Sequence, residues 1–168
     1  MARVKEFDLP DDLYYDAQEH IWARLEDGGV RVGLDMFGAC AAGTMAYIKL
    51  LPPGRQVQKG RPFGSMEAGK YVGPLKAPVS GSIAATNADV LANPGLANTD
   101  HYDKGWFVVI TPSDLDNELP TLVHGDQVQP WLEKEVSSVR TMDITELALA
   151  HGRFVVPDSA RPLAAVRE

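Results

Sequence analysis

Apolar and polar residues alternate along part of the first third of the chain in a pattern that predicts a β-hairpin. Residues 21–26 (IWARLE) and 30–34 (VRVGL) place apolar side chains at alternate positions, and Asp27, Gly28 and Gly29 separate the two segments. Asp-Gly and Gly-Gly pairs tolerate the positive φ angles of a tight turn. The two segments are therefore expected to pair as antiparallel strands.

A short helix and a series of short strands are expected next. Asp35 is a suitable N-cap for a helix over 35–42 (DMFGACAA), and Gly43 stands just beyond its end. The segments that follow share strand-forming residues interrupted by Gly and Pro: 45–50, 57–67, 71–78, 81–87 and 106–111. This close spacing of strands and turns predicts a small barrel or sandwich.

The pattern becomes helical after Pro112. A helix is predicted over 126–139, with Pro130 near its first turn. Residues 143–146 (DITE) resemble a capping box that opens a second short helix ending before Gly152. The last twelve residues, 157–168, are expected to form a loose tail on the surface.

Composition limits the class of protein. The chain has 168 residues, of which 45% are apolar and 23% charged, so one globular domain with a modest appendage is expected. We expect no membrane span and no secretory signal, since no apolar run is long enough. The net charge of −7 argues against nucleic-acid binding. A single cysteine, Cys40, suits a reducing compartment, so a cytoplasmic protein is expected, with Cys40 as a packed, inert thiol.

The usual catalytic signatures are absent from the sequence. The four histidines are scattered without metal-ligand spacing, so no metal site is expected. There is also no GxSxG motif and no phosphate-binding loop. What remains is Lys70, which follows Gly69 and stands ten residues after Gly60 and eleven before Gly81. This symmetry predicts that Lys70 occupies the exposed tip of a turn, although an ordinary solvated lysine fits the same local pattern.

An ordered set of motifs gives Lys70 a wider context. The motifs are Pro10-Asp11-Asp12-Leu13, Glu19-His20-x-Trp22, Val57-x-x-Gly60, Ser65-x-Glu67-x-x-Lys70, Ala77-Pro78-Val79-Ser80-Gly81, Asn93-Pro94-x-Leu96, Asn98-x-Asp100-x-Tyr102, Gly105-Trp106 and Pro112-Ser113-Asp114. From Leu9 to about Val136 the chain therefore resembles the H-protein family of the glycine cleavage system, which is related to the lipoyl and biotinyl domains.

The resemblance implies a fold and a cofactor. The fold is a mostly β, lipoyl/biotinyl-type barrel-sandwich hybrid with an added short helix and a helical C-terminal extension. The cofactor is lipoate, joined to Lys70 as an amide; biotin is less suitable because biotinyl proteins place methionines beside the lysine. Lys76 is the other candidate lysine, but it precedes Ala77 inside an expected strand. The chain would then be a carrier and a substrate of other enzymes, without catalytic residues of its own.

The resemblance also suggests supporting residues and partners. Gly69 is expected to shape the turn, and Glu67 to assist recognition by the lipoate ligase or lipoyl transferase. His20 is expected either to line the groove in which an H protein rests its loaded arm or to make a structural hydrogen bond. The expected partners are that ligase or transferase and either the glycine cleavage enzymes or a heterodisulfide-reductase-like complex.

Three departures from the family pattern bear on the pathway. Ala68 and Gly69 replace the usual residues before the lysine, Pro74 stands where an acid is expected, and the chain extends about thirty residues past the usual end. They favour a lipoate-binding H-like protein of bacterial sulfur oxidation over an H protein that carries the aminomethyl group. An unlipoylated interaction module of the same fold is a third alternative. The expected division is a lipoyl domain over 1–136 and an extension over 137–168.

Overall fold

The strands within residues 1–141 form three antiparallel sheets. The computed structural model describes residues 1–141 of the chain. The largest sheet has seven strands in the order β12-β3-β4-β5-β11-β10-β7. Their bounds are β3 (Tyr14–Tyr15), β4 (Ile21–Glu26), β5 (Gly29–Leu34), β7 (Gln56–Val57), β10 (Gly81–Thr86), β11 (Val108–Pro112) and β12 (Val123–His124).

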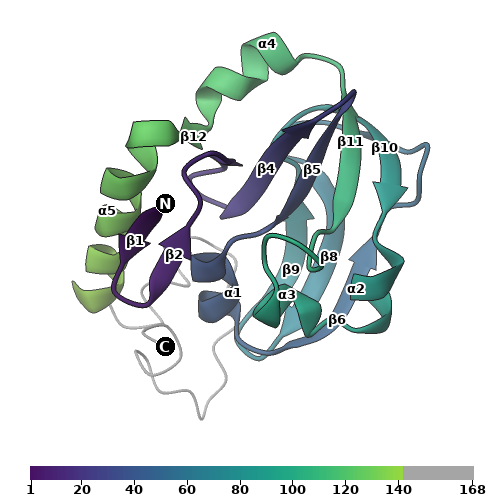
Figure 1. The fold of residues 1–168 in the computed structure, drawn as a ribbon. Helices are drawn as coiled ribbons and strands as arrows, with labels where there is room; N and C mark the ends of the chain where they lie inside the picture. Colours follow the sequence, from purple (N-terminus) through teal and green to yellow (C-terminus); the bar gives the residue numbers. More distant parts are fainter. Residues whose placement is uncertain (142–168) are drawn as a thin grey trace.

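Two smaller sheets complete the β-structure. The three-stranded sheet has the order β6-β8-β9, and the two-stranded sheet pairs β1 with β2. Their bounds are β6 (Met45–Leu50), β8 (Pro62–Ala68), β9 (Val72–Lys76), β1 (Ala2–Val4) and β2 (Phe7–Leu9). The three-stranded sheet lies behind the seven-stranded one in Figure 1. The prediction of a mostly β protein with a helical C-terminal segment is confirmed. The barrel part of that prediction is not met, because the sheets do not close.

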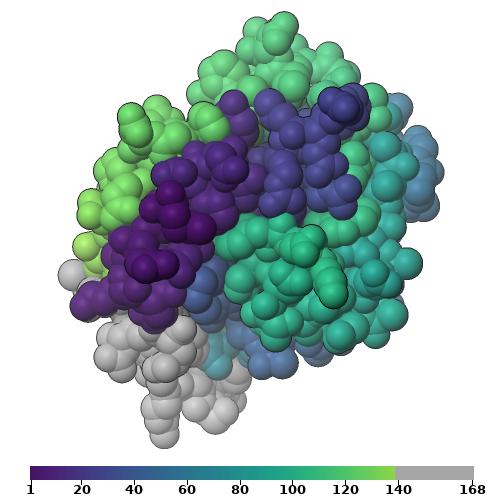
Figure 2. Space-filling view, in the orientation of Figure 1, coloured from purple at the N-terminus to yellow at the C-terminus, as the bar shows by residue number. Residues whose placement is uncertain are grey.

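Short helices connect the strands, and one longer helix follows them. Their bounds are α1 (Met36–Ala42), α2 (Ala88–Ala92), α3 (Leu96–Thr99), α4 (Leu115–Glu118), the 3-10 helices η1 (Leu119–Thr121) and η2 (Gly125–Gln127), and α5 (Val128–Thr141). Helix α5 lies beside β1 and β2 (Figures 1 and 2). It continues through residue 136, and the division of the chain at that residue stays a prediction.

Local turn and cap chemistry explains why the elements before the site form. The β4–β5 hairpin closes at the Glu26–Gly29 pair, and Gly28 takes the left-handed φ of +71° that the tight turn requires. Helix α1 begins after Asp35, whose side chain accepts a hydrogen bond from the Gly38 N–H at 2.8 Å. It ends at Gly43, which has a φ of +88°. These predictions are confirmed.

Two predicted elements begin later than expected. β11 starts at Val108 and not at Trp106, because the Trp106 carbonyl accepts a hydrogen bond from the Asn87 side chain. Helix α5 starts at Val128 because a 3-10 turn capped by His124 precedes it. The predicted helix that opens at residues 143–146 and the tail over 157–168 lie outside the described residues.

Two apolar clusters hold the elements together. One fills the space between the seven-stranded and three-stranded sheets, where the Phe63 and Phe107 ring centroids lie 6.1 Å apart. The other joins β1 and β2 to α1 and α5, through buried residues such as Phe37 and Leu132. Helix α1 therefore packs between the sheets and the C-terminal helix. Within residues 1–141, no helix is long and apolar enough to cross a membrane.

Candidate functional site

Lys70 lies in the turn that joins β8 to β9. Glu67 pairs with Val72 across the hairpin, and the Ala68 N–H donates to the Tyr71 carbonyl at 2.8 Å, which leaves Gly69 and Lys70 at the turn. The predicted position in a turn is confirmed. The predicted exposure at the tip is wrong, because Lys70 is half-buried where its turn packs against the connection from α1 to β6.

Two backbone hydrogen bonds fix this turn. The Gly69 N–H donates to the Thr44 carbonyl at 3.1 Å, and the Lys70 N–H donates to the Ala42 carbonyl at 2.7 Å. Gly43 lies between the two acceptors, and its left-handed φ turns the chain from α1 into β6. The position of the Lys70 backbone is therefore set by a segment almost thirty residues earlier in the chain.

Asn98 in turn fixes that segment. Its Oδ1 accepts a hydrogen bond from the Met45 N–H at 2.8 Å, and its Nδ2 donates to the Gly43 carbonyl at 2.9 Å. The two bonds tie α3 to the α1–β6 connection that carries the Lys70 turn. Sequence reasoning noted Asn98 only as a member of a motif and assigned it no role.

An open groove lies beside Lys70, with a volume of about 610 Å³. We call it the Lys70 groove. Its lining comes from α1, the α1–β6 connection, the Lys70 turn and the α3 region: Ala39, Cys40, Gly43, Thr44, Gly69, Lys70, Gly95, Asn98, Thr99 and His101. The volume falls in the range that small-molecule sites occupy, roughly 300–1,000 Å³. Lys70 and Gly69 both line this groove, and their role in binding a cofactor stays a prediction.

The described lining of the groove is close to electrically neutral apart from Lys70. It contains no carboxylate. Burial lowers the pKa of His101, whose Nδ1 lies 2.9 Å from the Ala97 carbonyl, so this imidazole is uncharged near neutral pH. A neutral wall of small side chains suits an uncharged, mostly apolar guest.

Cys40 is half-buried at the wall of the groove. Burial, with further contributions from Glu6 and Asp35, raises the pKa of its thiol to about 11. The thiol is therefore protonated near neutral pH and is a poor nucleophile toward a disulfide. This supports the interpretation of Cys40 as an inert thiol, even though it faces the groove.

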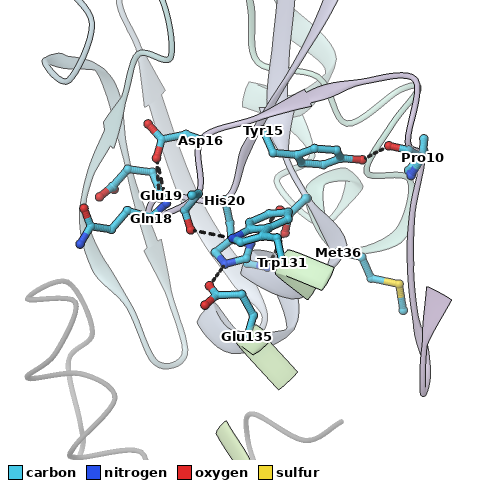
Figure 3. A network of polar contacts seen from close by, with 12 residues as sticks. Pro10, Tyr15, Asp16, Gln18, Glu19, His20, Met36, Trp131 and Glu135 are labelled. Atoms are coloured by element: carbon cyan, nitrogen blue, oxygen red, sulfur yellow. Dashed lines mark hydrogen bonds and ion pairs between the residues drawn. The ribbon is translucent and has the colours of Figure 1, made fainter. Parts of the chain in front are cut away.

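His20 lies in a different place, inside the contact between α1 and α5. It is 3% exposed, and its Nδ1 lies 2.8 Å from Asp35 Oδ2 while its Nε2 lies 2.6 Å from Glu135 Oε1. Trp131 stacks on one side of the ring (Figure 3) and Phe37 also stacks on it, with centroids 4.9 and 4.7 Å away. We call His20, Asp35 and Glu135 the His20 cluster.

The charge state of His20 follows from this packing. Burial lowers the pKa of the imidazole, but the charge and hydrogen bond of Asp35 and the hydrogen bond of Glu135 outweigh burial and raise it to about 9. The ring is then an imidazolium that donates one N–H to each carboxylate. His20 is not among the described residues that line the Lys70 groove, so the structure favours the alternative prediction of a structural hydrogen bond.

Glu67 is exposed on β8, one strand position before the turn begins. It is close to Lys70 in sequence but is not part of the described groove lining. For metals, residues 1–141 contain no group of three or more His, Cys, Asp or Glu side chains that could hold an ion.

Comparison with known proteins identifies the family. The family model described as "Glycine cleavage H-protein" matches residues 13–135. Glycine cleavage system H protein 2 of Aquifex aeolicus is 36% identical over 132 residues, covering 76% of this chain and 82% of that protein. The glycine cleavage system H protein of Anoxybacillus flavithermus is 37% identical over 127 residues, covering 76% and 98%.

A solved structure agrees with the sequence comparisons. The crystal structure of a glycine cleavage system H protein from Mycobacterium marinum matches with a TM-score of 0.59 and 32% identity, covering 62% of this chain and 87% of that one. The chain therefore belongs to the glycine cleavage H-protein family, whose members are non-catalytic carriers of a covalently attached lipoyl group.

Proposed function

We propose that this chain is the lipoyl carrier of a glycine cleavage system and that Lys70 is its attachment site. The observation that carries the proposal is the place of Lys70 in a backbone-fixed turn at the edge of a groove large enough for a small-molecule guest. The lysine side chain is the reactive group of this turn, and an amide at Nζ would remove its charge.

The residues around Lys70 fit a lipoyl group. The described groove lining is neutral and rich in small side chains, and the thiol of Cys40 is held protonated. When bound, the lipoyl group supplies a redox-active disulfide that can accept a transferred group on sulfur. The chain itself would hold the attachment point in place, offer the arm a site that is partly shielded from water, and keep its own cysteine from attacking the disulfide.

The proposed role as a lipoyl carrier also indicates the partners. A lipoate ligase or lipoyl transferase would load Lys70, and the glycine cleavage enzymes would use the arm. The relatives described above are named for glycine cleavage, and the expected preference for sulfur oxidation beside a heterodisulfide-reductase-like complex receives no support from them. The relatives therefore favour the alternative of an H protein of the glycine cleavage system over a protein of sulfur oxidation. A cytoplasmic location stays a prediction.

Intact-mass measurement tests the attachment site. The purified chain is incubated with lipoate, ATP and a lipoate–protein ligase, and the wild type is expected to gain the mass of one lipoyl group. Lys70→Arg should abolish the gain completely. Lys76→Arg, which alters a half-buried lysine on β9, is the matched control and should gain the same mass as the wild type. A gain that survives Lys70→Arg, or no gain in the wild type, would contradict the proposal.

A second assay tests the pathway. The loaded protein is offered to glycine decarboxylase with isotopically labelled glycine, and label is expected to become attached to the protein through its arm. Loaded Lys76→Arg should behave like the wild type. If the protein is lipoylated but takes up no label, the chain is a lipoyl carrier for another system.

A further inference from the structure

A second cavity lies against the seven-stranded sheet, apart from the Lys70 groove. It has a volume of about 330 Å³ and shares no described lining residue with that groove. Strands β4 and β5, the start of α2 and the connection from α3 to β11 contribute to its walls. Besides Trp106, its described lining consists of three cations and three carboxylates: Arg24, Arg31, Lys104, Glu26, Asp89 and Asp103. We call it the Arg24 cavity.

The two arginines of this cavity stand directly opposite each other. Arg24 on β4 pairs with Arg31 on β5, so the two side chains project from the same face of the sheet. Like charges in this relation destabilise a sheet unless other groups compensate them. Arg31 is compensated, because its Nε donates to Glu26 Oε2 at 2.7 Å. Arg24 Nη2 donates to the Tyr102 carbonyl at 2.7 Å, but within residues 1–141 Arg24 forms no ion pair.

Aromatic rings hold both guanidinium groups in place. The guanidinium carbon of Arg24 lies 4.9 Å from the centroid of the Trp22 ring, and that of Arg31 lies 4.4 Å from the centroid of the Trp106 ring. A guanidinium that contacts an aromatic face in this way still has N–H donors at its edge for a carboxylate. The donors are therefore positioned before a ligand arrives, which lowers the entropy cost of binding.

Asn87 fixes the wall that carries the free carboxylates. This residue is 4% exposed, and its Nδ2 donates to the carbonyls of Lys104 at 2.9 Å and Trp106 at 2.7 Å. Its Oδ1 accepts a hydrogen bond from the Asp89 N–H at 3.0 Å. The side chains of Asp89, Asp103 and Lys104 are exposed and form no ion pair within residues 1–141. The backbone is thus held in place, and these charges are available to a ligand.

The balance of charges indicates the class of ligand. The three cations and three carboxylates of the described lining cancel, so a simple anion would meet carboxylates and a simple cation would meet guanidinium groups. A zwitterion can pair with both. The volume lies at the lower end of the range for small-molecule sites, roughly 300–1,000 Å³. A planar carboxylate also matches the paired N–H donors of a guanidinium.

We propose that the Arg24 cavity binds a small zwitterion of the α-amino-acid class. The ligand carboxylate accepts hydrogen bonds from Arg24 and Arg31 and supplies the anion that this pair lacks. The ligand ammonium group donates to Asp89 and Asp103. Because Lys70 does not line this cavity, the inference goes beyond the proposed carriage of a lipoyl group and binding requires no lipoylation.

An NMR titration of the full chain tests the ligand class. L-Serine is added at constant ionic strength and slightly below neutral pH. Saturable shifts are expected for the side-chain N–H signals of Arg24, Arg31 and Trp106. N-Acetyl-L-serine lacks the ammonium group and L-serinamide lacks the carboxylate. Each of the two should bind about tenfold more weakly than L-serine, because one charged hydrogen-bonding group is lost.

Variants of the cavity test the assigned groups. Arg24→Gln removes the charge but keeps an N–H donor, and its affinity for L-serine is expected to fall about tenfold. Arg55→Gln makes the same change at an exposed arginine outside the described cavity lining and should remain within twofold of the wild type. In Asp89→Asn/Asp103→Asn the preference for L-serine over N-acetyl-L-serine should disappear. These two positions are exposed, so the double variant decides the question if Arg24→Gln does not fold.

The outcomes separate this inference from the proposed function. Shifts that grow without saturation, or that saturate in Arg24→Gln as in the wild type, would overturn the cavity as a binding site. N-Acetyl-L-serine that binds as tightly as L-serine would show a site for anions and overturn the zwitterion. Lipoylation of Lys70 is measured independently, so its failure would leave L-serine binding intact and overturn only the proposed function.

Discussion

Helix α1 contributes to two regions of opposite character. At its start, Asp35 bonds to the buried His20, which also bonds to Glu135 on α5. Farther along, Ala39 and Cys40 line the open, nearly neutral Lys70 groove. One short helix therefore connects a buried charged cluster with the groove proposed to receive the lipoyl arm.

The comparison shows which kind of feature indicates function in this protein. The His20 cluster contains a strongly shifted pKa, which elsewhere is a common sign of an active site. Both ring nitrogens, however, are bonded to carboxylates of the chain itself, and the ring is stacked between aromatic side chains. The described lining of the groove has no such charged pair but borders unfilled volume beside a lysine. Here the shifted pKa indicates stability, whereas the proposed function depends on free volume beside a reactive group.

Replacement of His20 is expected to distinguish the two regions most clearly, because it should lower the stability of the fold and leave lipoylation at Lys70 unchanged. His20→Asn suits the left-handed backbone of this residue, which has a φ of +59°. It should lower the free energy of unfolding by about 3–5 kcal/mol, because Asp35 is left buried without its cation. Urea unfolding measures the loss. The rate of lipoylation, measured at a temperature where the variant is folded, should be unchanged.

His124→Asn serves as the control for this change. His124 is half-buried, stacks on Tyr14 and makes one hydrogen bond to the Leu13 carbonyl, so its loss should cost only about 1 kcal/mol. Equal losses in the two variants would contradict the special role of the His20 cluster.

The pH dependence of stability is expected to give the next largest effect. The pKa of His20 is about 9 in the folded protein, compared with about 6.5 in the unfolded chain. The contribution of His20 to the free energy of unfolding is therefore fully present below pH 6.5 and is lost as the pH rises through 9. This contribution is on the order of 3 kcal/mol in total. Urea unfolding of wild type and His20→Asn between pH 6 and 10 isolates this term, and parallel curves would show that His20 is not the group responsible.

Replacement of Asn98 is expected to have the smallest effect on stability. It should also have a local effect on the hydrogen exchange of the Lys70 amide. Asn98→Ala removes both hydrogen bonds to the α1–β6 connection and should cost about 1–3 kcal/mol. Hydrogen exchange at the Lys70 amide should become faster, because its acceptor belongs to that connection. Asn98→Asp keeps the acceptor for the Met45 N–H, so its stability and its Lys70 amide exchange should lie between those of the wild type and Asn98→Ala. Unchanged protection of the Lys70 amide in Asn98→Ala would contradict the linkage.

Local chemistry made much of the fold predictable. The β4–β5 hairpin depends on Asp27 and Gly28, the start of α1 depends on Asp35, and the Lys70 turn lies between strands that the Gly and Pro pattern separates. Each of these features is decided within a few residues, so a single sequence contains the necessary information.

Long-range contacts explain what the sequence did not reveal. The groove exists because α3 contacts α1, and Asn98 bonds to residues more than fifty positions earlier. His20 meets Glu135 across 115 positions, and no local pattern distinguishes that contact from a place in the groove. The number and order of the sheets likewise depend on pairings such as β3 with β12.

The neutral lining of the Lys70 groove has a consequence for how the arm divides its time. An amide-linked arm with an uncharged end would enter the groove at little electrostatic cost. A cargo that bears an ammonium group would lose hydration there without meeting a carboxylate among the described lining residues, and that loss is unfavourable. The partition of the arm between groove and solvent would then depend on what it carries, and a charged load would favour the outward position, in contrast to the resting place that the resemblance implies for a loaded arm.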